Sequence, residues 1–100
     1  MWLFLSESFV SVVADRADRN RLLVRSRLEN DIPRIFSCAE VFTVPNSDYK
    51  YRAFLPREYV AKVISDQLLK IEYINFKDSV EDARHDAYFD VWSVMRAVQK

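Results

Sequence analysis

The chain contains no glycine among its 100 residues, whereas a protein of this length has about seven on average. Its absence excludes the glycine-rich loops that cradle phosphates and the glycine fingerprints of dinucleotide-binding folds. Turns that require a positive φ must use the other residues that tolerate the left-handed region. Asn20 and Asn46 are the candidates for such turns.

Cysteine and histidine occur once each, as Cys38 and His85. A single cysteine excludes an internal disulfide and any zinc site built from several cysteines. We expect Cys38 to be a small buried apolar residue, as free cysteines frequently are. Asp82, Asp86 and Asp90 recur every four residues around His85, which we interpret as a solvated helix face. We therefore predict no metal site and no cofactor.

Neither sign of charge dominates, because 15 Lys and Arg residues stand against 15 Asp and Glu residues. The chain lacks the overall positive field of many nucleic-acid-binding proteins, although a local basic patch is compatible with this balance. The apolar start is interrupted by Glu7 and has no basic region before it, unlike a signal peptide. No run approaches the about 18 apolar residues of a membrane span. We expect a cytoplasmic protein that does not enter a membrane.

Half of the residues are hydrophobic and 14 % are aromatic, which is enough for one core in a single domain of residues 1–100. Short β-branched or alternating segments predict strands at residues 9–16, 21–28, 40–45 and 49–56. Polar turns join them into two hairpins. Residues 2–5 either extend the first strand or form a separate short one.

Apolar spacing predicts three helices. A short one lies near residues 31–36, with Pro33 in its first turn. A long one follows Pro56, and residues 74–79 then form a loop. The last helix begins near Val80, and its apolar stripe comprises Tyr88, Val91, Trp92, Met95 and Val98. The predicted fold is α+β: a four-stranded antiparallel sheet of two hairpins, a short helix between them, and two C-terminal helices packed on one face.

The polar residues of the last helix and the preceding loop form the first candidate site. His85 lies at the edge of the apolar stripe, three residues before Tyr88, where it can act as a general base or serve a structural role. Asn75 and Lys77 lie in the loop between the helices, and loops on rigid elements frequently carry function. The alternative for Asn75 is a helix cap.

A second candidate is the polar face of the sheet. Arg25 and Arg27 project from one strand and Arg52 from another, beside Tyr51, and basic groups near aromatic rings bind phosphates or single-stranded nucleic acid. Alternation places Tyr51 on the face opposite Arg52, so nucleic acid is not favoured. The candidate binding residues are Arg25, Arg27, Tyr51, Arg52, Asn75, Lys77 and His85.

A catalytic site would require residues from three predicted elements to lie together in space. His85, Lys77, Arg52 and Tyr88 would form a metal-free ribonuclease or phosphoester-handling site, in which His or Tyr moves a proton and Lys or Arg stabilises the developing charge. Sequence alone does not show whether the three elements meet. No residue is assigned a catalytic role, and the chain carries no catalytic motif.

Several segments resemble a family of small bacterial proteins to which no activity has been assigned. They are MWLF with FVSVV, LLVRSR, SDYKYRAFLPR, YINFK and RHDAYFDVWSVM, and they cover nearly the whole chain. The resemblance implies a compact single-domain protein and no particular activity.

The neutral charge, the lack of a catalytic motif and the many aromatic residues favour a non-enzymatic function. The aromatic residues in excess of the core stripes are Trp2, Phe4, Tyr49, Tyr51 and Tyr73. We expect a small protein-binding or regulatory module whose partner is another protein or a second copy, as a homodimer formed through the sheet edge or exposed aromatics. The alternative is the phosphoester enzyme.

Overall fold

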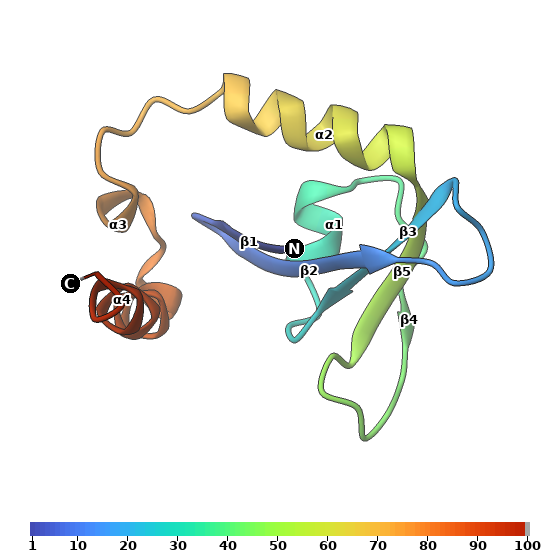
Figure 1. Ribbon diagram of the computed structural model, residues 1–100, viewed down its shortest axis with the longest axis horizontal. Helices are drawn as coiled ribbons and strands as arrows, with labels where there is room; N and C mark the ends of the chain where they lie inside the picture. Colours follow the sequence, from blue (N-terminus) through green and yellow to red (C-terminus); the bar gives the residue numbers. More distant parts are fainter. Residues whose placement is uncertain (100) are drawn as a thin grey trace.

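The computed structural model describes residues 1–99, and its strands form one antiparallel sheet in the order β1-β2-β3-β5-β4 (Figure 1). The strands are β1 (Trp2–Leu5), β2 (Ser8–Ala14), β3 (Arg21–Ser26), β4 (Phe42–Thr43) and β5 (Tyr51–Pro56). The helices are α1 (Asp31–Ile35), α2 (Arg57–Leu69), α3 (Phe76–Ser79) and α4 (Asp82–Arg96). The predicted α+β class and antiparallel sheet are confirmed.

The sheet has five strands, so the prediction of four is wrong. Residues 2–5 form the separate strand β1, which folds back on β2 with Trp2 opposite Ser11 and Leu5 opposite Ser8. The two predicted hairpins are present as the pairs β2–β3 and β4–β5, and β3 pairs with β5. Strand β4 is only two residues long. The extra strand forms because residues 6 and 7 turn the chain between two apolar segments.

A positive φ is found at Asn46 but not at Asn20, and the expected burial of Cys38 is wrong. Asn46 has a φ of 62° and is the only residue of 1–99 with a positive φ, so a turn uses asparagine where other chains use glycine. Asn20 does not share this conformation. Cys38 is exposed, contrary to the expected burial, because Phe36 fills the core at the end of α1.

The core lies between one face of the sheet and the helices α1 and α2. Its buried residues are Val10, Val12, Val24, Ala53 and Leu55 of the sheet, Ile32, Ile35 and Phe36 in and just after α1, and Val60 of α2. Alternation along each strand sends every second side chain into this layer. The opposite face carries Phe9, Leu23, Phe54 and Arg25, and among these Leu23 and Phe54 are cross-strand partners.

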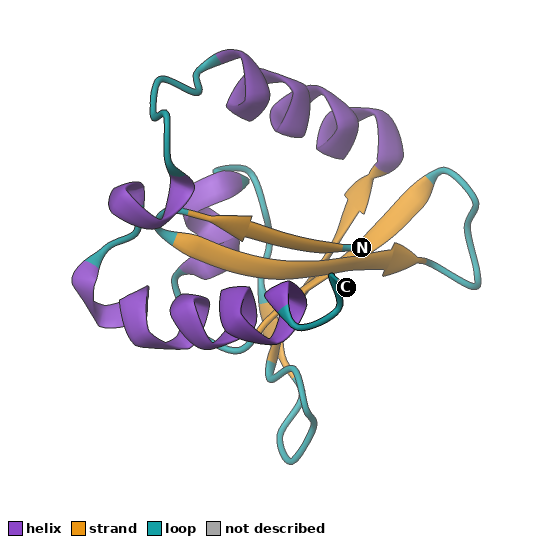
Figure 2. Ribbon diagram, turned by 60° about the vertical axis from the view of Figure 1, so that its left-hand side comes forward, coloured by secondary structure: helices purple, strands orange, loops and turns teal. Residues whose placement is uncertain are grey.

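The two long C-terminal helices lie on opposite sides of the β1–β2 hairpin (Figures 1 and 2). Helix α2 ends at Leu69 and contacts β3 and β5. Helix α4 meets the hairpin through Tyr88, whose ring lies edge-on to Phe4 at 5.3 Å between centroids. The two helices therefore do not pack on one face of the sheet, contrary to the prediction.

Candidate functional site

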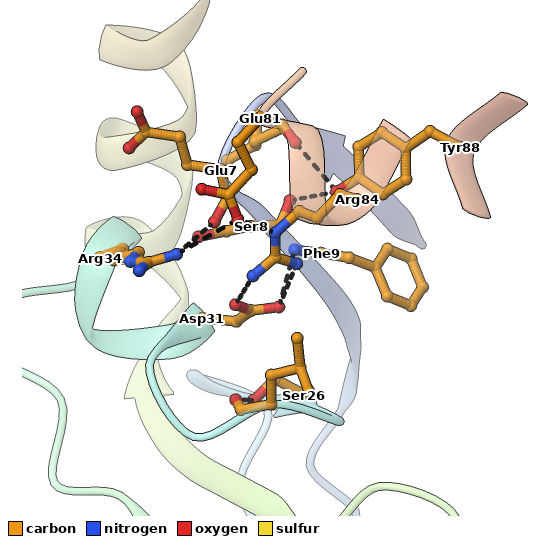
Figure 3. Close-up of polar contacts among 11 residues, drawn as sticks. Glu7, Ser8, Phe9, Ser26, Asp31, Arg34, Glu81, Arg84 and Tyr88 are labelled. Carbon is orange, nitrogen blue, oxygen red and sulfur yellow. Dashed lines mark hydrogen bonds and ion pairs between the residues drawn. The ribbon is translucent and has the colours of Figure 1, made fainter. Parts of the chain in front are cut away.

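A buried ion pair holds the C-terminal helix to the body of the protein (Figure 3). Arg84 of α4 donates one hydrogen bond of 2.9 Å and a second, shorter one to the carboxylate of Asp31 in α1. Asp31 is 2 % exposed and Arg84 is 8 % exposed. The Phe9 backbone N–H donates to Asp31 at 3.1 Å, and Arg84 Nε donates to Glu81 at 2.6 Å. The Asp31 carboxylate raises the pKa of Arg84 above its ordinary value.

Tyr88 adds a second anchor one turn further along α4. Its hydroxyl lies 2.9 Å from the Leu5 carbonyl and 3.0 Å from the Ser8 carbonyl, at the turn of the β1–β2 hairpin. Burial raises the pKa of Tyr88. Because its hydroxyl is engaged by main-chain carbonyls and Arg84 by carboxylates, we interpret these groups as anchors. The sequence did not identify Asp31 and Arg84, which are 53 residues apart.

The candidate catalytic residues separate into two places. His85 is exposed, and it lies with Lys77 and Tyr88 along a shallow depression that has no room for a water molecule. Arg52 lies on β5, three strands from β1, which corresponds to about 14 Å at ordinary strand spacing. The Arg52 Nε donates to the Tyr49 carbonyl at 3.0 Å. The four residues therefore do not converge on one pocket.

The arginines of the candidate basic patch do lie close together, but the aromatic ring beside them is covered. Arg25 and Arg52 are direct cross-strand neighbours. The guanidinium carbons of Arg25 and Arg27 lie 4.6 and 4.4 Å from the centre of the Tyr49 ring, which is 4 % exposed. Tyr51 packs against the core on the other face. The Tyr49 ring between these arginines is therefore not open for a nucleobase to stack on.

Asn75 and Lys77 are engaged within the C-terminal segment. The predicted loop contains the short helix α3, and the Asn75 side chain caps it by accepting a 3.1 Å bond from the Lys77 backbone N–H. The Lys77 ammonium lies 4.0 Å from the centre of the Trp92 ring, close enough for a cation–π contact. Both residues stabilise the junction of α3 and α4.

The free edge of β1 presents unused main-chain hydrogen-bonding groups. Met1 and Val12 exchange two backbone bonds, of 2.8 and 2.9 Å. In an antiparallel ladder such pairs alternate with pairs that point their N–H and C=O groups away. Trp2 and Phe4 therefore direct these groups outward from β1, and within residues 1–99 no further strand pairs with that edge.

The two edges of the sheet differ in their protection. Strand β4 has two residues, and Pro45 follows shortly after it; short length and proline both hinder the addition of another strand. Strand β1 reads WLFL, without charge or proline. Its first residue, Trp2, is 67 % exposed. The β1 edge is thus the one at which another strand can be added.

A groove of about 420 Å³ lies along β1, between this strand and the C-terminal half of α2. In Figure 2, β1 lies below α2, with α3 beyond its end. The groove has a mixed lining, whose polar residues are Ser6, Glu7, Ser8, Arg34, Gln67 and Lys70. Its apolar lining includes Leu3, Leu5, Ile64, Leu68, Ile71 and Tyr73. The volume lies within the range of ligand-binding clefts. We define these residues and the edge of β1 as the β1 groove.

Comparison with known proteins finds no match to this chain among family models, curated proteins or solved structures. The resemblance to small bacterial proteins therefore stays a prediction. Within residues 1–99, no helix has the length and apolar character needed to cross a membrane. The same residues contain no group of three or more His, Cys, Asp or Glu side chains able to hold a metal ion.

Proposed function

We propose that this chain is a protein-binding module that takes an extended segment of a partner protein as an added strand on β1. The observation that carries the proposal is the outward direction of the N–H and C=O groups of Trp2 and Phe4, at an open groove. Strand addition to a sheet edge obtains affinity from main-chain hydrogen bonds and specificity from pockets for alternate side chains.

The lining of the β1 groove indicates what kind of segment would fit. Alternate side chains of an added strand point to opposite faces of the sheet. Those on the core side would meet Leu3, Leu5 and Ile64, and those on the other side would meet Trp2 and Phe4. The preferred segment is therefore extended and has apolar residues on both faces.

The phosphoester-handling alternative has less support. It requires Arg52 beside His85 and Lys77, and the order of the strands separates Arg52 from α4. An added strand, by contrast, uses groups that already lie together along one edge.

Selection of peptides from a displayed random library on the immobilised protein tests the proposal. The variant W2P removes the outward N–H of Trp2 and leaves intact the bonds of β1 to β2, because proline is tolerated where the missing N–H faces away from the sheet. The variant W2T also removes the indole but keeps the N–H, and serves as the matched control.

We expect a selected peptide to bind W2P at least about tenfold more weakly than W2T, as the loss of a buried hydrogen bond requires. Binding should also slow hydrogen exchange at the Trp2 and Phe4 amides. A library that yields no binder, or a binder with equal affinity for W2P and W2T, would contradict the proposal.

A further inference from the structure

One face of α4 is buried in its first half and exposed in its second. Arg84, Tyr88, Val91 and Met95 follow one another at spacings of four and three residues and so share one side of α4. Val98 follows in the turn just after the helix ends at Arg96. Arg84 and Tyr88 are buried against Asp31 and the β1–β2 hairpin. Val91, Met95 and Val98 are 39, 62 and 65 % exposed. The side of α4 that is buried as far as Tyr88 is therefore exposed beyond it.

The rest of the helix is mixed, because Phe89 and Trp92 stack on each other beside this surface and are 45 and 37 % exposed. Val94, which flanks the stripe, is 67 % exposed. Asp86, Asp90 and Ser93 lie on the opposite side, as expected for a face in water. We call Val91, Val94, Met95 and Val98 the α4 stripe. An apolar stripe of this kind usually packs against another element.

The chain exposes more surface than a compact monomer of its mass. Its accessible area is 7453 Å², whereas a compact monomer of 11.9 kDa exposes about 5,900 Å². The excess is therefore about 1,500 Å² per chain. The radius of gyration of 14.4 Å also exceeds the about 13 Å of a compact 100-residue domain.

We infer that a second copy of this chain covers the α4 stripe, with α4 packed antiparallel on α4 of the partner copy. Two chains that each bury the excess area would form an interface of about 3,000 Å² in total, the size of obligate homodimer interfaces. A two-fold axis brings the same patch of both copies together. The centre of the contact falls near Val94 and Met95, the middle of the exposed stretch.

The open face of the sheet enlarges the surface available to the partner copy. Helix α4 lies on the side of the β1–β2 hairpin away from α2 (Figures 1 and 2). The rings of Phe42 and Phe54 stack at 5.6 Å on this face of β4 and β5 and are 39 and 41 % exposed. This inference does not rest on the proposed function, because it is argued from α4 and the open face of the sheet.

Sedimentation velocity over a range of concentrations, on the full chain, tests the inference. The variant M95E places a charge in the α4 stripe, and S93E places the same charge on the polar side of the same helix. We expect a wild-type dimer, a dissociation constant at least about 100-fold higher for M95E, and a change within about threefold for S93E. Far-UV circular dichroism verifies that both variants are folded.

A cross-linking measurement does not depend on a charged variant. In the background C38S, oxidation of M95C should produce a disulfide-linked dimer at micromolar protein concentration, whereas S93C should not. The inference is overturned if the wild-type chain stays monomeric at all concentrations, if M95E and S93E dimerise equally, or if S93C cross-links as fast as M95C. A monomeric chain that still binds peptides in the β1 groove would overturn only the dimer.

Discussion

Arg84 of α4 and Asp31 of α1 form a two-bond ion pair inside the protein, although 53 residues separate them in the chain. Removing both charges from water is unfavourable, and the geometry offsets this through additional hydrogen bonds from Phe9 and to Glu81. The pair stabilises the attachment of the C-terminal helix to the sheet. It also determines which part of α4 is buried and which part extends beyond the body.

Substitution of Arg84 should therefore be strongly destabilising. R84M leaves the Asp31 carboxylate buried without its partner, and we expect a loss of about 3–5 kcal/mol in the free energy of unfolding. The control R34M removes a guanidinium that is 44 % exposed and lies 3.7 Å from Glu81, so its effect should be below about 1 kcal/mol. Urea unfolding measures both. Equal losses in the two variants would show that the buried pair is not the anchor.

Tyr88 should make the stability depend on pH in the alkaline range. Burial raises the pKa of its phenol in the folded state, so the folded protein retains this proton at pH values where the unfolded chain releases it. This contribution to stability is complete below about pH 10 and is lost as the pH rises further. The variant Y88F has no proton to lose there and should show a shallower decline between neutral and alkaline pH. Identical slopes for wild type and Y88F would exclude this role.

The direction of the β1 main chain can be measured without a ligand. The amide of Phe4 points away from β2, whereas those of Leu3 and Leu5 bond to it. We expect the Phe4 amide to exchange with solvent much faster than the Leu3 and Leu5 amides in native-state hydrogen exchange. Exchange should be recorded on M95E, so that self-association does not protect the edge. Equal protection of Phe4 and Leu5 would remove the basis for strand addition.

Local patterns in the sequence were sufficient for much of the fold. Alternation at residues 21–28 and 49–56 identified β3 and β5, and the apolar spacing after Pro56 identified α2. The lack of glycine led to Asn46 as a residue with positive φ. These features depend on interactions between near neighbours in the chain, which a periodic pattern expresses directly.

The candidate sites were less predictable. His85, Lys77 and Arg52 were selected by residue type, and the structure separates Arg52 from the other two. Arg25 and Arg52 are neighbours, but Tyr49 beneath the arginines is covered. The β1 groove was not predictable from the sequence. The outward direction of a main-chain N–H depends on strand pairing and not on the type of residue.

The sequence by itself determined the α+β class, most of the strands and the apolar stripe of the last helix, because alternation and helical spacing follow from local geometry. Only the tertiary structure decided which part of that stripe is covered. The pairing of Asp31 with Arg84 and the separate strand β1 join segments that are distant in the chain. They direct the first half of α4 onto the hairpin and leave the α4 stripe and the β1 edge uncovered, because burial is a property of the assembled surface.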